Sequence, residues 1–285
     1  MHFTKVQGAG NDFILIESGR MKRDWPQMAR TMCNRHFGIG GDGLLLLSPS
    51  KVADFRMRIV NADGSEPEMC GNAIRCLARY IFEAGLISEK VTELTIDTLA
   101  GIKKVELKKT RGKLTSVRVG MGQPEFSAEK IPVVFTQPDN RSLDINIVNY
   151  PVVVDSQKLS LSFISMGNPH AICFVEQPVS DFPLLTVGPK MENHAMFPRR
   201  TNFEVAKVLS PGQIEVRVWE RGVGETLACG TGACAVAVAA QLLGFTGQET
   251  GIKLPGGALF IEWDGAGEVF LSGPAEIAFT GEWPE

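Results

Sequence analysis

The sequence predicts an α+β protein of two pseudo-symmetric domains, each a curved, mostly antiparallel β-sheet or barrel around a central helix. Three observations lead to this prediction. Short strand-like segments with alternating apolar residues recur along the chain, separated by turn residues. Helical periodicity is clear in two places, directly after Cys70 and directly after Cys229. The surroundings of these two cysteines also match each other, which indicates an internal duplication.

The predicted strands are short, and most alternate apolar with polar residues, as antiparallel sheet requires. They cover residues 3–6, 13–16, 55–60, 94–97, 103–107, 116–119, 145–154, 171–175, 204–209, 214–219, 258–263 and 268–271. The two clear helices are expected to end at Gly85 and Gly244, because glycine commonly closes a helix. A weaker helical pattern lies near residues 25–35.

The duplication is visible when Cys70 is laid over Cys229, because the alternating segment 55–60 then falls on 214–219. The matched pairs are Arg58 and Arg217, Glu66 and Glu225, Ala78 and Ala237, and Gly85 and Gly244. A second match, shifted by two residues, sets Gly10-Asn11 against Gly167-Asn168. We therefore expect a first domain of residues 1–125, joined by a C-terminal strand at 275–285, and a second domain of residues 126–274. The active site is expected in the cleft between them, where the two helix starts would face each other.

Composition and charge exclude several classes of protein. The net charge is −3, and the sequence contains no block of basic residues. Both observations argue against a nucleic-acid partner. The chain shows neither a signal peptide nor an apolar stretch long enough to cross a membrane. Six cysteines without export signals predict reduced thiols in the cytoplasm. No metal is expected, since Cys33 and His36 lack the second half of a zinc site.

A cysteine placed just before a helix has special chemistry. Its sulfur lies near unpaired backbone N–H groups and the positive end of the helix dipole, which should lower its pKa. The same N–H groups offer a site for a carboxylate. Cys76 and Cys234 lie further inside the helices among apolar residues and are expected to be core, and packing is also favoured for Cys33 and Cys173.

Two such helix starts facing each other could invert an amino acid. A carboxylate held between them would place its α-carbon between the two sulfurs, and the N–H groups would stabilise the carbanion that forms. One sulfur, as thiolate, would remove the α-proton while the other, as thiol, returns a proton from the opposite side. The sulfurs should then stand about 6–7 Å apart with substrate bound, in a cleft that closes to exclude water.

Several motifs together resemble the diaminopimelate epimerase family, in its order and spacing, from Phe3 to about Gly273. They are Gln7-Gly8-Ala9-Gly10-Asn11-Asp12-Phe13, Asn61-Ala62-Asp63-Gly64-Ser65-Glu66, Cys70-Gly71-Asn72-Ala73-Ile74-Arg75-Cys76, Met166-Gly167-Asn168-Pro169-His170, Glu220-Arg221-Gly222-Val223-Gly224-Glu225-Thr226 and Ala228-Cys229-Gly230-Thr231-Gly232. The resemblance implies interconversion of LL- and meso-diaminopimelate, in lysine and peptidoglycan-precursor synthesis, without metal or other cofactor and usually as a homodimer.

The resemblance also implies roles for individual residues. Cys70 and Cys229 would be the base and the acid. The substrate-binding residues would be Asn11 and Glu220 at the reacting ammonium, Gly71, Asn72, Gly230 and Thr231 at its carboxylate, and Asn61, Asn168, Asn202 and Arg221 at the distal end. These roles suit the chemistry, because an Arg fork fits a distal carboxylate and amide oxygens fit an ammonium.

Other readings of these residues stay open. Asn11 and Asn61 also fit turns, Glu220-Arg221 fits a solvated strand end, and His170 fits either a structural role or tuning of a cysteine. The sequence departs from the family at Gly43, where a Gln is frequent, and at Ala73, where a second Gly is frequent. A same-fold racemase of histidine, proline or hydroxyproline is the nearest alternative. More distant ones are a thiol redox protein, a phenazine-pathway-like isomerase and a non-catalytic binding descendant.

Overall fold

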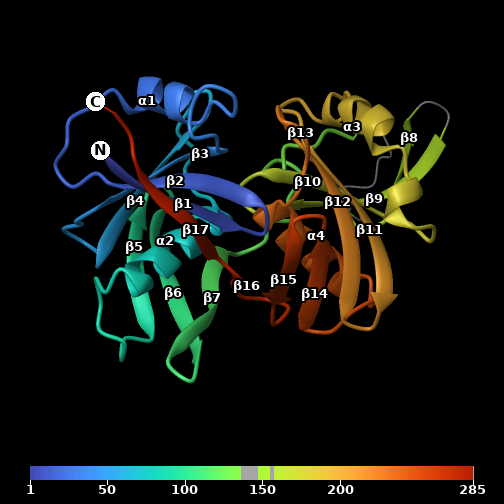
Figure 1. Cartoon of the computed structure of the whole chain (residues 1–285). Coiled ribbons are helices and arrows are strands. Elements are labelled where there is room, and N and C mark those ends of the chain that lie inside the picture. Colours follow the sequence, from blue (N-terminus) through green and yellow to red (C-terminus); the bar gives the residue numbers. More distant parts are fainter. Residues whose placement is uncertain (136–146, 155–156, 285) are drawn as a thin grey trace. The chain divides into compact units, whose positions relative to one another are not determined.

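The computed structural model describes residues 1–135, 147–154 and 157–284. The chain divides into two compact units, of which the first comprises Met1–Gly120 with Ser272–Glu285 and the second comprises Met121–Leu271. Each unit consists mostly of strands and, among its described residues, has two α-helices (Figure 1). No helix in the described ranges is long and apolar enough to cross a membrane.

The first unit begins with a hairpin and continues by alternating parallel and antiparallel steps. Its elements are β1 (His2–Gly8), β2 (Asn11–Glu17), α1 (Trp25–Met32), β3 (Gly43–Ser48), β4 (Phe55–Asn61), α2 (Gly71–Glu83), β5 (Glu93–Thr98), β6 (Gly101–Thr110), β7 (Lys113–Gly122) and β17 (Glu276–Glu282). Strand β2 pairs parallel with β3 and β4 pairs parallel with β5, while β1–β2, β3–β4, β5–β6 and β6–β7 are antiparallel. The C-terminal strand β17 runs antiparallel to β1.

The second unit repeats this order of steps. Its elements are β8 (Tyr150–Val154), β9 (Gln157–Ser165), β10 (Pro169–Phe174), the 3-10 turn η1 (Val179–Asp181), α3 (Leu184–Glu192), β11 (Asn202–Ser210), β12 (Gln213–Glu220), β13 (Gly224–Thr226), α4 (Gly230–Leu242), β14 (Glu249–Leu254), β15 (Gly257–Glu262) and β16 (Val269–Gly273). Strand β10 pairs parallel with β11 and β12 pairs parallel with β14, while β9–β10, β11–β12 and β14–β15 are antiparallel.

The two units therefore have the same connectivity, which confirms the predicted pseudo-symmetry. In both, one helix lies in the first parallel crossover, as α1 or α3, and another lies in the second, as α2 or α4. Parallel neighbours need such crossovers, whereas antiparallel neighbours are joined by tight turns. Strand β13 has no counterpart in the first unit as described.

Matched positions also make the same ion pair in each unit. Arg58 donates from Nε and Nη2 to the two carboxylate oxygens of Glu66 at 2.7 and 2.9 Å. Arg217 donates in the same way to Glu225 at 2.8 and 3.1 Å. Each pair joins the strand before the cysteine to the segment that leads toward it, which is a loop in the first unit and β13 in the second. Because a two-point contact fixes orientation as well as distance, each pair holds its segment in a defined position.

The helices α2 and α4 are the central helices of their units (Figure 1). Helix α2 contacts β1, β2, β3, β4 and β17, and α4 contacts β9, β10, β11, β14 and β15. Both end as expected: Gly85 and Gly244 follow the last turns with φ of 68° and 74°, in the left-handed conformation that glycine adopts without a Cβ penalty. Nearly all of α4 is buried, which accounts for its small apolar residues.

Several elements differ from the sequence prediction. Strands β3, β9, β13 and β14 and helix α3 were not predicted at all. Strand β3 is apolar and buried on both faces, so it lacks alternation, and α3 contains Gly188 and Pro189, which obscure a helical pattern. Of the strand expected at 145–154, residues 145–146 lie outside the described ranges, and β8 begins at Tyr150.

Candidate active site

Cys70 is the residue immediately before α2, with an extended backbone at φ −146° and ψ 117°. Its sulfur lies 3.7 Å from Asn11 Oδ1, an acceptor for the thiol hydrogen. Asn72 Nδ2 donates to the same oxygen at 3.4 Å. The structure thus brings together Cys70, Asn11 and Asn72, three residues predicted for one end of the site, with Gly71 opening the helix between them.

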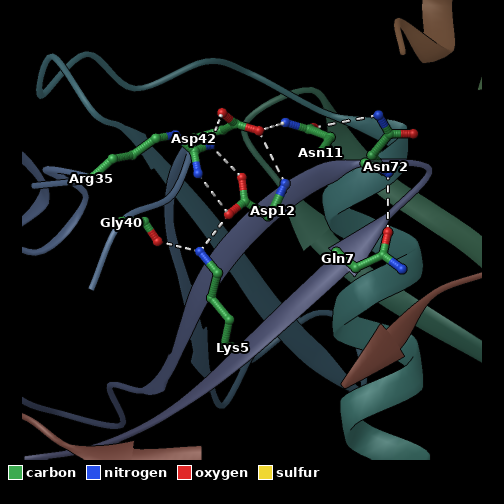
Figure 2. A network of polar contacts seen from close by, with 9 residues as sticks. Lys5, Gln7, Asn11, Asp12, Arg35, Gly40, Asp42 and Asn72 are labelled. Atoms are coloured by element: carbon green, nitrogen blue, oxygen red, sulfur yellow. Dashed lines mark hydrogen bonds and ion pairs between the residues drawn. The ribbon is translucent and has the colours of Figure 1, made fainter. Parts of the chain in front are cut away.

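A charged cluster fixes the orientation of Asn11 (Figure 2). Asn11 Nδ2 donates to Asp42 Oδ2 at 2.5 Å, and Arg35 Nη2 donates to Asp42 Oδ1 at 2.9 Å. Asp12 pairs with Lys5 at 2.5 Å and with Arg35 at 2.6 Å. Partial burial acts to raise the pKa of Asp12, but the hydrogen bonds and charges of Arg35 and Lys5 outweigh it and lower that pKa. With its amide nitrogen held by Asp42, Asn11 presents its oxygen to Cys70.

Arg75, whose side chain is fully buried, orients Asn72. Arg75 Nη2 donates to Asn72 Oδ1 at 2.8 Å, and Arg75 Nε donates to the Pro274 carbonyl at 3.4 Å. Since an amide oxygen accepts and an amide NH₂ donates, this contact turns the Asn72 NH₂ toward Asn11. Charged neighbours, Asp42 and Arg75, therefore determine which way the side-chain amides of Asn11 and Asn72 point.

Gly43, where the family frequently has Gln, has no room for a side chain. A Cβ at this position of β3 would lie 2.8 Å from the backbone oxygen of Val60 on the antiparallel neighbour β4. Real Cβ atoms do not approach a backbone atom so closely. The backbone of β3 and β4 therefore admits only glycine at position 43 without a shift. A Gln side chain, and any contact it could make with a substrate, is excluded here for a steric reason.

We expect Gly43→Ala to lower the free energy of unfolding by about 1–3 kcal/mol, because the backbone of β3 or β4 must move to admit the methyl group. Gly251→Ala in β14 is the matched control, since its Cβ would meet nothing nearer than 3.5 Å and should change stability by less than about 0.5 kcal/mol. Urea unfolding of both variants measures the difference. Equal stabilities would show that the β3–β4 contact relaxes freely.

Cys229 occupies the equivalent position before α4, with φ −121° and ψ 114°, and its side chain is buried. Its sulfur lies 3.4 Å from Thr231 Oγ1 in the first turn. The expectation that the helix start lowers this cysteine's pKa is wrong in direction for Cys229. Burial, followed by the charge of nearby Glu220, raises the pKa of Cys229 well above its usual value, because removing a thiolate from water costs more than the helix start returns.

Glu220 ends β12 and is half-buried. Thr226 Oγ1 donates to its Oε1 at 2.5 Å. Burial raises the pKa of Glu220, although hydrogen bonds from Thr226 and Cys229 act in the opposite direction. The predicted residues Glu220 and Cys229 are thus close enough for the carboxylate to accept the thiol hydrogen.

A chain of hydrogen bonds runs behind Cys229. Asn168 Nδ2 donates to Thr231 Oγ1 at 3.2 Å, and Asn168 Oδ1 lies 3.0 Å from His170 Nε2. His170 Nδ1 lies 2.7 Å from Glu204 Oε1, and both His170 and Glu204 have no exposed surface. Asn168 and His170 therefore connect to the cysteine through Thr231 and not by direct contact with its sulfur.

The remaining predicted residues make hydrogen bonds within their own units. Asn202 donates from Nδ2 to the Pro169 carbonyl at 2.9 Å and accepts at Oδ1 from the backbone N–H of Arg221 at 2.9 Å. Arg221 Nη1 donates to the Arg199 carbonyl at 2.9 Å. Asn61, at the end of β4 in the first unit, donates to Ser65 Oγ at 2.9 Å. Asn202 and Arg221 are brought together, whereas Asn61 belongs to the other unit.

The four cysteines expected to pack in the core do so, since Cys33, Cys76, Cys173 and Cys234 are all buried. Burial raises the pKa of Cys33 and Cys76 to about 12 and that of Cys173 to about 11. In the described part of the chain, no group of three or more His, Cys, Asp or Glu side chains is placed to hold a metal ion.

Two residues beside the site were not singled out from the sequence, Asp42 and Glu204. Asp42 lies in a glycine-rich loop, where an acidic residue is unremarkable. Glu204 had a usable signal: it occupies a position of β11 flanked by Phe203 and Val205, all three of them buried. A carboxyl group is rarely found there without a partner.

Several solved structures share this fold. A hydroxyproline epimerase from Agrobacterium vitis, with bound trans-4-hydroxy-L-proline, matches 99% of this chain and 90% of its own with a TM-score of 0.70 at 15% identity. A phenazine biosynthesis protein of the PhzF family from Bacillus anthracis matches 100% of this chain and 99% of its own with a TM-score of 0.68 at 15% identity. Likeness at this identity shows the fold alone.

Sequence relatives narrow the class. The sequence profile of the diaminopimelate epimerase family matches residues 3–127 and 162–278. A diaminopimelate epimerase of Pelotomaculum thermopropionicum is 48% identical over 287 residues, covering 100% of this chain and 99% of its own. One of Methanococcus maripaludis is 44% identical over 284 residues, covering 99% of each. The chain belongs to the diaminopimelate epimerase family and is an isomerase of the epimerase type.

Proposed function

We propose that this protein interconverts LL- and meso-diaminopimelate by moving the α-proton between Cys70 and Cys229. The observation that carries the proposal is that the two cysteines occupy the same position, directly before the central helix, in two units of matching connectivity apart from β13. Full-length relatives named diaminopimelate epimerase support the substrate, whereas the hydroxyproline epimerase shares the fold at only 15% identity. A proline, hydroxyproline or histidine racemase is therefore the less favoured function.

The substrate carboxylate would bind the backbone N–H groups that open the two helices, at Gly71, Gly230 and Thr231, with Asn72 adding a side-chain donor. Those donors stabilise the negative charge that enters the carboxylate when the α-proton leaves. Asn11 offers an amide oxygen, and Glu220 a carboxylate, to the ammonium at the same carbon. Both are acceptors, which an ammonium requires.

At the distal end, Arg221 would pair with the second carboxylate, and Asn61, Asn168 and Asn202 would complete the recognition of the second amino-acid group. The reaction requires one sulfur on each face of the α-carbon, so the two domains, residues 1–125 with 275–285 and residues 126–274, would close on the substrate between them. No cofactor takes part in this mechanism. The enzyme would act in the cytoplasm as a homodimer, and its product would supply lysine and peptidoglycan-precursor synthesis.

Cys229 is suited to this task by its high pKa. A thiolate whose pKa has been raised by burial is a stronger base than an exposed one, and the α-proton of an amino acid needs a strong base. The positive ammonium of the substrate, bound near Glu220, would offset the carboxylate charge that helps to keep Cys229 protonated in the empty site. Formation of the thiolate would then depend on substrate.

Proton NMR in heavy water tests the proposal. LL-diaminopimelate incubated with the enzyme should be converted to the meso isomer while solvent deuterium replaces its α-hydrogen. Proline, hydroxyproline and histidine, offered under the same conditions, should neither racemise nor exchange. Turnover of one of these with none of diaminopimelate would identify the rival racemase, and inactivity on all four would reject the proposed function.

A further inference from the structure

The buried carboxyl group of Glu204 has no part in the reaction proposed above, yet it lies directly behind Cys229. Glu204 is on β11 and its partner His170 is on the parallel neighbour β10. The start of α4 packs against this carboxyl group, since a Cβ at Gly232 would lie 2.7 Å from Glu204 Oε1. Its other oxygen, Oε2, has no hydrogen-bond partner among the described residues. A buried polar group of this kind requires an explanation.

The hydrogen bonds define where the protons of the His170–Glu204 pair must be. Asn168 Oδ1 can only accept, so His170 Nε2 must carry a hydrogen to make the 3.0 Å contact. A second proton then lies between His170 Nδ1 and Glu204 Oε1. The pair is either imidazolium with carboxylate or imidazole with carboxylic acid, and its net charge is zero in both cases. A neutral pair also limits the cost of burying the unpartnered Oε2.

This arrangement sets the direction of every hydrogen bond as far as Cys229. Because Asn168 turns its oxygen toward His170, its NH₂ donates to Thr231 Oγ1. The Thr231 hydroxyl, having accepted this bond, can direct its own hydrogen to the Cys229 sulfur 3.4 Å away. If His170 lost the hydrogen on Nε2, Asn168 would turn over and its oxygen would take the Thr231 hydrogen away from the sulfur.

We propose that Glu204 is a positioning residue for Cys229: by holding His170 with a hydrogen on Nε2, it orients Asn168 and Thr231 so that the Thr231 hydroxyl donates to the cysteine thiolate. This inference rests on the proposed role of Cys229 in proton transfer. The side chain that bonds to a histidine nitrogen decides which tautomer the ring adopts, and buried polar networks transmit such choices because each member must remain satisfied.

Two variants separate hydrogen bonding from packing and charge. Glu204→Gln is uncharged but keeps an NH₂ that can donate to His170 Nδ1, so the Nε2–H form is retained. Glu204→Leu fills the space but cannot donate. We expect E204Q to keep kcat within about twofold of the wild type, and E204L to lower kcat roughly tenfold, with a smaller rise in KM because Asn168 also belongs to the proposed binding site. Should E204L fail to fold, Glu204→Met takes its place with the same expectation.

Alkylation of Cys229 by iodoacetamide, followed by mass spectrometry without substrate, gives a readout independent of turnover. E204L should slow the modification several-fold, because the thiolate loses a hydrogen bond, and E204Q should leave its rate unchanged. Thr250→Val is the matched control. It removes a buried hydroxyl group in β14 of the same unit, and it should leave both kcat and the alkylation rate within about twofold of the wild-type values.

A double-mutant cycle tests whether the effect passes through Thr231. In a Thr231→Val background, E204L should lower kcat less than about twofold further. Additive losses, equal damage by E204Q and E204L, or faster alkylation in E204Q, which would reveal an anionic carboxylate beside the sulfur, would each overturn the proposal. If the wild type does not epimerise diaminopimelate, the proposed function fails on its own account, and the alkylation rates still decide the role of Glu204.

Discussion

Cys70→Ala and Cys229→Ala should each lose epimerisation by at least about 10⁴-fold, while keeping α-hydrogen exchange with one stereoisomer. Inversion needs a base on one face of the α-carbon and an acid on the other, so neither sulfur alone can complete it. The remaining sulfur can still remove and return a proton on its own face. We therefore expect the two variants to exchange opposite stereoisomers at the reacting centre, measured by NMR of LL- and meso-diaminopimelate in heavy water.

The core cysteines of the same helices provide matched controls. Cys76 in α2 and Cys234 in α4 are fully buried, so Cys76→Ala and Cys234→Ala should cost about 1 kcal/mol of stability through lost packing. Their epimerisation rates should stay within about twofold of the wild type. Full epimerisation by either Cys70→Ala or Cys229→Ala, or exchange of the same stereoisomer by both, would contradict the two-base mechanism.

Glu220→Gln should lower kcat/KM by about 10²–10³-fold and yet make Cys229 more reactive toward iodoacetamide. The carboxylate helps to raise the pKa of Cys229, so its removal should lower that pKa and increase the thiolate fraction in the empty protein. Activity should fall because the ammonium loses its carboxylate partner. Slower epimerisation together with a thiol that is alkylated faster is not expected from simple loss of structure.

The pH profile gives a further test of Glu220. The pKa of Glu220 is raised by burial, so protonation should begin at a higher pH than for an exposed Glu, whose pKa is about 4.3. The acidic limb of wild-type kcat/KM should therefore lie above that value and should be absent in E220Q. Glu215→Gln on the same strand, where Glu215 is a half-buried partner of the exposed Lys253 at 2.8 Å, should leave the profile unchanged. An unaltered limb in E220Q would assign it to another group.

The duplicated parts of the fold were the most predictable from sequence. Each copy combines an alternating strand, a cysteine and an amphipathic or apolar helix closed by glycine, and these local patterns agree with the tertiary structure. The ion pairs Arg58–Glu66 and Arg217–Glu225 join positions that the sequence match had aligned, although the pairs themselves were not predicted. Strand β3 and helix α3 were missed because their signals are not local: β3 is buried on both faces by its neighbours, and α3 is held by contacts with β11 and β12 despite its glycine and proline.

The motifs indicated which residues of the candidate site lie near each cysteine, but the electrostatics of these residues were not predictable from them. The sequence places Cys229 at a helix start, and only the surrounding burial and Glu220 reverse the expected direction of its pKa. Glu204 meets His170 across two parallel strands, β10 and β11, whose pairing brings together residues far apart in sequence. Asp42 likewise reaches Asn11 through the parallel pairing of β2 and β3.

The matching connectivity of the two units has a consequence for how this site evolved. A single unit that paired with a copy of itself would have surrounded both sulfurs with identical groups. Once the two copies were fused in one chain, each could change alone, and they have done so: Cys70 faces an amide oxygen, whereas Cys229 faces a hydroxyl group. In the mechanism proposed above, this difference would give each face of a chiral substrate its own, chemically distinct thiol.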